Sequence, residues 1–299
     1  MMQPQQPIIP LFLVPGTHIG FYYEVVPGVN RTGRYGLVVS VKSHNGYMRD
    51  AVCKAQINKQ HHDREVEILK AMQNTEGYPT FYDELTLMTN IPHYVCIISD
   101  NGATLHDVLQ RSGRRMSNEN VIRIGYQLFT IINRLHQKGY VHRDLHLLNI
   151  LVKVGLDGEL KLTIVDYGLA RPSVPAPPSH EMLSYHASFQ VSSGDAYTPM
   201  DDLTSIVINL MILSDIDPFG ADMNWMLQRK RAFHASPWQP FFGTGREWIV
   251  GLYLETQRQR EHGSRHAQLM NLFQEAIPGF DPSTPITFGF FDDENFAIL

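Results

Sequence analysis

The spacing of apolar residues changes character near residue 100 and divides the chain into two parts. Before that point, short runs rich in β-branched residues are bounded by Gly, Asn and Asp, a pattern that predicts strands. These runs lie at residues 37–41, 51–54 and 94–98. The pair Asn45-Gly46 between the first two runs predicts a tight hairpin turn. Residues 62–72 predict one amphipathic helix, because apolar side chains recur there every third residue.

Beyond a polar stretch at residues 99–102, the apolar residues follow a helical period. Residues 118–138 carry a long apolar stripe, and Gly139 directly after them predicts the end of the helix. Residues 203–213 are almost wholly apolar, as in a helix surrounded by protein, and residues 266–276 are amphipathic. Together these patterns predict an α+β fold in which a small β-rich lobe precedes a larger helical lobe.

Composition limits which binding partners and which cellular compartment are expected. The 299 residues carry a net charge of −5, which disfavours binding to nucleic acid or to an anionic membrane surface, so neither is expected as a partner. No apolar run is long enough to cross a bilayer. Cys53 and Cys96 are too few for a disulfide framework and favour a reducing compartment, the cytoplasm or the nucleus. We expect an intracellular, monomeric protein.

Two short polar clusters, at residues 140–149 and 164–170, carry the candidate chemistry. Each places a carboxylate in a turn beside a β-branched run, so a hairpin of the two runs would bring Asp144, Asn149 and Asp166 to one edge. Oxygen ligands of this kind suit Mg²⁺, which prefers one or two carboxylates together with phosphate and water oxygens. A carboxylate that the metal does not need could orient a hydroxyl group and accept its proton.

The string His142-Arg143-Asp144-Leu145 with Asn149, followed by Asp166-Tyr167-Gly168, resembles the catalytic loop and the metal-binding motif of protein kinases. The resemblance implies the two-lobed protein kinase fold, with ATP and Mg²⁺ as cofactors and a protein as substrate. It also implies that Asp144 is the catalytic carboxylate and that Asn149 and Asp166 are the metal ligands.

The first lobe contains segments that resemble the remaining kinase motifs. Residues 51–54 resemble V-A-I-K, which implies that Lys54 holds the α- and β-phosphates and that Glu65 is its acidic partner. Gly33 and Gly36 match the second and third glycines of the phosphate-covering loop. Ile98 would be the gatekeeper, with the hinge beside it. The resemblance therefore implies a nucleotide site made by Gly33, Gly36, Val38, Ala51, Lys54, Ile98, Ser99 and Asn101.

Several further segments resemble the casein kinase 1 group, which includes tau-tubulin and vaccinia-related kinases. Residues 70–80 and 102–107 are similar to that group's motifs, and D-Y-G-L-A is the form found in vaccinia-related kinases. Residues 184–190 occupy the place of the group's A-R-Y-A-S-I-N, which faces the protein substrate. The resemblance also implies that Asp202 is the buried carboxylate that braces the catalytic loop. It extends from about residue 22 to 288.

Four positions depart from the pattern. His146 replaces the lysine that touches the γ-phosphate, and neutral imidazole brings no fixed positive charge, so we expect slower transfer. Arg31 replaces the first loop glycine. Tyr185 and Met223 replace the two basic residues with which the group recognises acidic or primed substrates. A preference for such substrates is therefore not expected.

These observations predict an ATP- and Mg²⁺-dependent protein serine/threonine kinase, with His146 among the catalytic residues. A catalytically weak pseudokinase that binds nucleotide as a scaffold is the alternative, and a small-molecule kinase is a third. Residues 229–231 predict a solvated helix face, and His142 a structural histidine rather than a zinc ligand. The expected domains are an extension at 1–20, the N-lobe at 21–98, a hinge at 99–103, the C-lobe at 104–288 and an acidic tail at 289–299.

Overall fold

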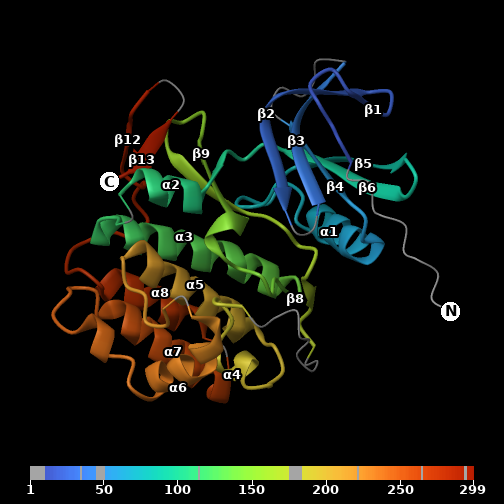
Figure 1. The fold of residues 1–299 in the computed structure, drawn as a ribbon. Helices are drawn as coiled ribbons and strands as arrows, with labels where there is room; N and C mark the ends of the chain where they lie inside the picture. Colours follow the sequence, from blue (N-terminus) through green and yellow to red (C-terminus); the bar gives the residue numbers. More distant parts are fainter. Residues whose placement is uncertain are drawn as a thin grey trace. The chain divides into compact units, whose positions relative to one another are not determined.

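The computed structural model divides the chain into a β-rich unit that ends at Asn101 and a helical unit that begins at Gly102 (Figure 1). This confirms the expected α+β class with a small β-rich lobe and a larger helical lobe. The division falls inside the expected hinge. The structure describes residues 11–33, 36–44, 51–113, 115–174, 184–220, 222–263, 265–292 and 295–299.

An antiparallel sheet forms the first unit, with the strand order β1-β2-β3-β4-β6-β5. The predicted strands at 37–41, 51–54 and 94–98 are confirmed as β3, β4 and β6. The predicted turn Asn45-Gly46 lies outside the described residues. The strands are β1 (His18–Ile19), β2 (Tyr23–Gly33), β3 (Gly36–Ser43), β4 (Ala51–Gln56), β5 (Phe81–Met88) and β6 (Pro92–Ser99).

Helix α1 (Lys59–Ala71) confirms the predicted helix but begins three residues earlier. The side chain of Asn58 caps it by accepting a hydrogen bond from the amide of His61, which satisfies one of the free donors at the helix start. Figure 1 shows α1 against the sheet. A core cluster of this unit includes Leu13 and Ile19, so part of the expected extension 1–20 is built into the lobe.

Within the described ranges, the helical unit contains seven α-helices, three 3₁₀ turns, short strands and the two polar clusters. Its helices are α2 (Leu105–Arg111), α3 (Asn118–Gln137), α4 (Phe189–Ser192), α5 (Pro199–Leu213), α6 (Met226–Ala235), α7 (Trp248–His262) and α8 (His266–Glu275), with 3₁₀ turns η1 (Leu147–Asn149), η3 (Met223–Trp225) and η4 (Gln239–Phe241). Its strands are β7 (Ala103–Thr104), β8 (Tyr140–Val141), β9 (Ile150–Val154), β10 (Leu160–Ile164), β11 (Arg171–Pro172), β12 (Phe288–Phe290) and β13 (Phe296–Ile298).

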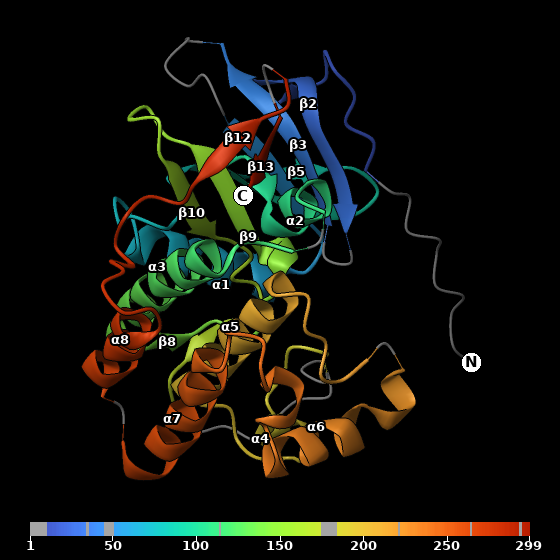
Figure 2. The same cartoon turned by 90° about the vertical axis from the view of Figure 1, so that its left-hand side faces the viewer.

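Helix α5 lies at the centre of this unit, as its apolar sequence predicts. It packs against α3 and α7, and α8 packs against the same two helices (Figure 2). Gly125 in α3 permits the close packing, because a Cβ atom there would lie 2.5 Å from the ring of Phe273. The predicted helix 118–138 is confirmed, and Gly139 follows it with a φ of +81°.

The predicted hairpin between the two polar clusters is confirmed. β9 and β10 pair antiparallel in a register that places Ile150 opposite Ile164. The residues before β9 and after β10 therefore emerge at the same end of the hairpin. These are the segments that carry Asn149 and Asp166.

The expected acidic tail at 289–299 is instead part of the fold. β12 pairs with β13, and the side chains of β13 are buried. The carbonyl oxygen of Leu299 accepts hydrogen bonds from the Ser117 hydroxyl at 2.9 Å and from the Asn120 amide at 2.6 Å, at the start of α3. Apolar Phe296 and Ile298 outweigh the neighbouring acidic residues, which explains the error. No helix in the described ranges is long and apolar enough to span a membrane.

Candidate active site

A buried ion pair joins β4 to α1 in the first unit. The Nζ atom of Lys54 lies 2.7 Å from Oε1 of Glu65, and the second carboxylate oxygen accepts a hydrogen bond from Gln56 at 3.1 Å. Only 8% of Lys54 and 1% of Glu65 is exposed to solvent. Since an unpaired buried charge is costly, this contact fixes both the lysine ammonium and the orientation of the helix. The sequence-based pairing of these two residues is therefore realised in the structure.

The strand register corrects one residue of the expected nucleotide site. Side chains alternate between the faces of a strand, so Ala51 and Lys54, three positions apart, point to opposite faces. Ala51 is buried in the apolar core with Cys53 and Val41. Val52 shares the face of Lys54, and Val38 lies directly opposite Lys54 in the neighbouring strand. Of residues 51–54, Val52 and not Ala51 shares the face of Lys54. Val52 therefore takes the place in the expected nucleotide site that was assigned to Ala51.

The glycine pair of the expected phosphate-covering loop closes the hairpin between β2 and β3. Gly33 lies opposite Gly36 in the register, and Arg31 lies opposite Val38 inside β2. Gly36 has a φ of +158°, and a Cβ atom there would lie 2.1 Å from the carbonyl oxygen of Ala55. The backbone therefore excludes any larger residue at position 36.

The expected hinge residues lie at the end of β6, where Asn101 folds back on Ser99 through a hydrogen bond. The amide group of Asn101 donates to the Ser99 carbonyl at 2.8 Å, and the Ser99 amide donates to the Thr80 carbonyl at 2.9 Å. Ile98, the expected gatekeeper, is buried in β6 and lies opposite Val52. These contacts fix the backbone of the segment on which the adenine would be recognised.

In the second unit, the expected catalytic carboxylate and an expected metal ligand are in direct contact. The Nδ2 atom of Asn149 donates to the Asp144 carbonyl at 2.9 Å and lies 3.4 Å from its Oδ2. The Asn149 carbonyl accepts from the amide of Val165 at 3.0 Å, which joins the loop to the segment before Asp166. Asp166 has a φ of +67°, in the left-handed region that side chains other than glycine rarely adopt. The two polar clusters are therefore brought together.

His142 sets the spacing of the two clusters and is not a metal ligand. It is fully buried, its Nε2 lies 3.0 Å from the Val165 carbonyl, and its Nδ1 accepts from the amide of Asp144 at 3.3 Å. These partners require a neutral ring that carries its proton on Nε2. Burial lowers the pKa of His142, in agreement with that state. The residue is structural, as the sequence analysis predicts.

Asp202 holds the backbone of the catalytic loop in place through hydrogen bonds. Its two oxygens accept from the backbone amides of His142 at 2.8 Å and Arg143 at 2.9 Å, from the Tyr197 hydroxyl at 2.6 Å and from His136 at 2.9 Å. Burial alone would raise its pKa, but the hydrogen bond and charge of His136 hold the pKa below its usual value. Arg143 has a φ of +75°, a strained conformation that these amide contacts stabilise.

Comparison with known families identifies the fold that carries this arrangement. Residues 31–232 match the protein kinase domain, a span of more than half the chain. The chain belongs to the protein kinase domain family. The matched residues include Lys54, Glu65, Asp144, Asn149 and Asp166.

Individual kinases are similar to parts of the chain. A CDPK-related protein kinase of Daucus carota is 25% identical over 66% of this chain and 33% of its own length. Nucleosomal histone kinase 1 of Drosophila melanogaster is 28% identical over 46% of this chain and 23% of its own. Cyclin-dependent kinase F-3 of Oryza sativa subsp. japonica is 31% identical over 52% of this chain and 36% of its own. The chain thus spans about a third or less of the length of these relatives, and their names do not single out the casein kinase 1 group.

The residues of this kinase domain fit Mg²⁺. With Nδ2 of Asn149 committed to Asp144, the Oδ1 atom is the one that can face a cation. Together with the Asp166 carboxylate it gives one amide and one carboxylate oxygen, a small set that phosphate and water oxygens would complete. Among the described residues, no group of three or more His, Cys, Asp and Glu side chains could hold a metal ion by itself.

His146 lies beside Asp144, the expected catalytic carboxylate. Its Nε2 is 3.6 Å from Oδ2 of Asp144, and its ring is 5.8 Å from that of His186. Burial, together with the charges of His146 and Lys230, lowers the pKa of His186 to about 3, so this ring is neutral. The imidazole of His146 therefore occupies the space between Asp144 and the segment expected to face the substrate.

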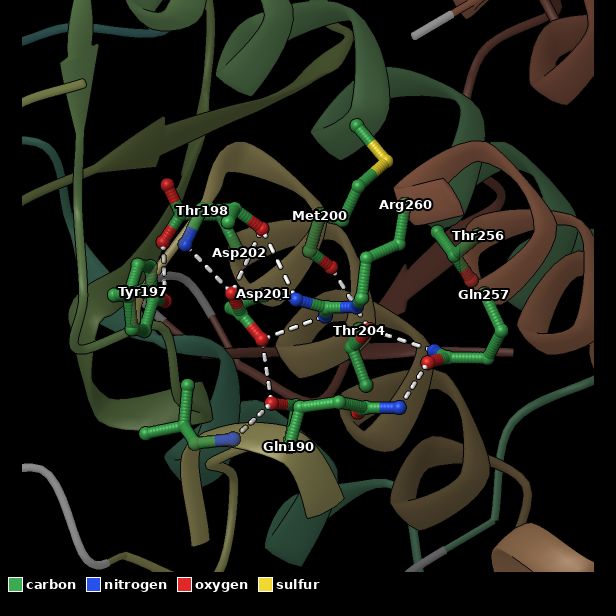
Figure 3. A network of polar contacts seen from close by, with 12 residues as sticks. Gln190, Tyr197, Thr198, Met200, Asp201, Asp202, Thr204, Thr256, Gln257 and Arg260 are labelled. Carbon is green, nitrogen blue, oxygen red and sulfur yellow. Dashed lines mark hydrogen bonds and ion pairs between the residues drawn. The ribbon is translucent and has the colours of Figure 1, made fainter. Parts of the chain in front are cut away.

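A second buried carboxylate, Asp201, was not among the expected site residues. Arg260 of α7 binds both of its oxygens, at 2.6 and 3.0 Å, and Thr198 donates to it from its amide and hydroxyl (Figure 3). Ser188, which precedes α4, also donates to Asp201. The spacing of Thr198 and Asp201 before an apolar helix is a capping-box signal that the sequence does contain. Arg260, 59 residues further on, carries no such signal.

Lys230 corrects the expectation of a solvated face at residues 229–231. It is 2% exposed, and its Nζ donates to oxygens of the segment 184–192. Burial lowers its pKa to about 7. Arg231 is exposed, as expected. Three consecutive cationic residues on a helix point in different directions, so a single solvated face cannot hold them all.

Proposed function

We propose that this protein kinase domain transfers the γ-phosphoryl group of ATP, with Mg²⁺, to serine or threonine hydroxyls of protein substrates, and that it belongs to the casein kinase 1 group. The similarity to kinases named for CDPK, cyclin-dependent and histone kinases supports a protein substrate. The motifs at residues 70–80, 102–107 and 184–190 support the narrower group.

The contact between Lys54 and Glu65 carries the proposal of an active enzyme. Phosphoryl transfer in protein kinases requires this ion pair to be in place together with the metal-binding aspartate. Both members are buried and separated by 2.7 Å. A protein that had no need to align phosphates would gain nothing from keeping these two charges out of water.

The residues have separable tasks in the proposed reaction. The ammonium of Lys54 would bind and orient the α- and β-phosphates, and Asp166 with Asn149 would hold Mg²⁺, which neutralises charge that develops on the phosphates. Asp144 would orient the substrate hydroxyl and accept its proton. Because the catalysis consists of positioning and charge neutralisation, the braces supplied by His142 and Asp202 are part of the site.

The surroundings of Tyr185 support a substrate preference different from that of the group. Its hydroxyl donates to Asp217, whose carboxylate also accepts from the amides of Phe219 and Gly220. A carboxylate therefore lies beside the position where the group has an arginine. Because like charges repel, an acidic or phosphorylated substrate side chain is disfavoured there. We propose that basic proteins are better substrates than acidic ones.

A pseudokinase with a scaffold role is the second candidate, and His146 favours it. A neutral imidazole near Asp144 cannot replace the lysine charge at the γ-phosphate. The rival predicts nucleotide binding with little or no transfer.

The deciding experiment is Mg²⁺-dependent transfer of labelled phosphate from ATP to histone, a basic protein, and to casein, an acidic one. Wild type is compared with Asp144→Asn, which keeps the shape of the side chain but cannot accept the proton. We expect transfer by wild type only, with histone preferred. ATP binding without transfer above the Asp144→Asn level would reject the kinase proposal and favour the scaffold.

A further inference from the structure

Residues 184–192, termed here the substrate platform, are held by one buried side chain from α6. The Nζ atom of Lys230 donates to the carbonyl oxygens of Ser184 at 2.8 Å and Ala187 at 2.5 Å, and to the hydroxyl of Ser192 at 3.2 Å. In its protonated form the side chain has three N–H donors, and these contacts use all of them. Since the three acceptors belong to one segment, a single side chain fixes both ends of the platform.

Burial of the Lys230 side chain costs free energy, so we expect the buried lysine to have a role that an apolar side chain could not fill. Lysine is rarely fully buried unless it is paired, and its three acceptors here are uncharged oxygens. The ring of Phe219, with its centroid 5.7 Å from Nζ, offers a weak further contact. A leucine or methionine would fill the same space without desolvating a charge. What the lysine adds is a fixed position for the platform backbone.

The anchored segment leads directly to the catalytic carboxylate. His186 lies between the two anchored carbonyls, and its own carbonyl accepts from Ser205 at 2.8 Å. Its ring is 5.8 Å from His146, which is 3.6 Å from Asp144. A shift of the platform would therefore move the groups beside the substrate hydroxyl while leaving the Lys54 ion pair of the other unit in place.

We propose that Lys230 is a positioning residue for the protein substrate, and that it acts by clamping the substrate platform against the catalytic loop. This inference rests on the proposed kinase function. It assigns the clamp to the protein-substrate side of the reaction and not to the nucleotide side.

Steady-state kinetics separates these two sides. Lys230→Met keeps the length of the side chain but removes its donors, and Arg231→Met makes the same kind of change at an exposed neighbour. We expect Lys230→Met to raise the KM for histone at least tenfold, the size of effect that loss of charged hydrogen bonds produces, with the KM for ATP within about twofold of wild type. Arg231→Met should change neither. An unchanged KM for histone, or equal rises in both KM values, would overturn the proposal.

Hydrogen–deuterium exchange tests the clamp without any need for activity. We expect amides of residues 184–192 to exchange at least tenfold faster in Lys230→Met, while those of α3 keep their wild-type rates. Ser192→Ala removes only the longest contact of Lys230 and should increase the local exchange rate less, by about twofold to threefold. This variant provides the test if Lys230→Met does not fold. Unchanged exchange in the platform of Ser192→Ala and Lys230→Met would reject the clamp. Faster platform exchange in an enzyme that transfers no phosphate would reject the kinase function alone.

Discussion

Two consecutive buried carboxylates, Asp201 and Asp202, hold different parts of the helical unit by different means. Asp202 faces the catalytic loop and accepts hydrogen bonds from two backbone amides, a tyrosine hydroxyl and a histidine. Asp201 faces the substrate platform and α7, and its main partner is the guanidinium of Arg260. Figure 3 shows Asp201 with its partners Arg260 and Thr198, and it also labels Asp202 and its partner Tyr197.

The difference shows how the same side chain can serve positioning or stability. A carboxylate held by backbone amides fixes the conformation of those amides, so its loss changes the geometry of the loop. A buried carboxylate paired with a cation is left as an uncompensated charge when the cation is removed, so loss of the cation lowers the free energy of unfolding. We therefore expect Asp202 to control the rate of transfer and Asp201 with Arg260 to control stability.

The largest expected effect is on stability. Arg260→Met removes the cation from a carboxylate that is fully buried, which should lower the free energy of unfolding by about 3–5 kcal/mol. Arg258→Met lies on the same helix and removes an exposed pair with Glu255, so it should cost less than about 1 kcal/mol. Urea unfolding of the two variants measures the contrast. Equal losses would mean that burial of Asp201 does not decide the effect.

A smaller effect is expected on catalysis. Asp202→Asn replaces one accepting oxygen by a donor that faces other donors, so one of the two loop amides, that of His142 or that of Arg143, loses its partner. We expect kcat to fall about tenfold to a hundredfold, which corresponds to the loss of hydrogen bonds to a charged group, about 1.5–3 kcal/mol. Asp201→Asn should affect kcat less. If Asp201→Asn gave the larger loss of kcat, the division of labour between the two aspartates would be wrong.

The capping hydroxyl at the start of α5 should contribute less again. Thr198→Ala removes the hydrogen bond at 2.9 Å from the hydroxyl to Asp201 and should lower stability by about 1 kcal/mol. Thr198→Ser keeps the hydroxyl and should remain close to wild type in the same thermal unfolding experiment. A loss of stability in Thr198→Ser as large as in Thr198→Ala would assign the effect to the methyl group.

The smallest effect appears only in acid. The folded-state pKa of Asp202 lies below its ordinary value of 3.8, so the carboxylate adds stability above that pH and loses it as the pH falls through the lower folded value. Asp202→Asn should therefore lose less of its remaining stability than wild type when the pH is lowered past 3.8. Urea midpoints measured along an acid titration give the result. Parallel curves for wild type and variant would show that Asp202 is not responsible for the acid sensitivity.

The fold and half of the site could be predicted because their signals are local. Strands β3, β4 and β6, the long α3 and the hairpin of β9 and β10 follow from short-range periodicity. The contact of Lys54 with Glu65 and that of Asp144 with Asn149 agree with motifs of known spacing. Strand β5 was missed, because its sequence Phe-Tyr-Asp-Glu-Leu-Thr-Leu-Met does not alternate, although its burial in the folded unit does.

The remaining residues depend on contacts between distant parts of the chain. Arg260 meets Asp201, and Lys230 meets Ser184, and no local pattern distinguishes these cations from their exposed neighbours. The error at Ala51 has a different cause. The motif is aligned in step at Lys54, but the nucleotide contact was assigned to Ala51, three residues before the lysine, and not to Val52, two residues before it. Because strand side chains alternate, a difference of one residue exchanges the two faces.

The contact of Leu299 with Ser117 has a consequence for synthesis on the ribosome. The two residues are 182 positions apart, and the last strand, β13, supplies buried side chains and an acceptor for the start of α3. Helix α3 is therefore made long before the residues that complete its surroundings. The helical unit can reach its full set of contacts only after residue 299 has left the exit tunnel.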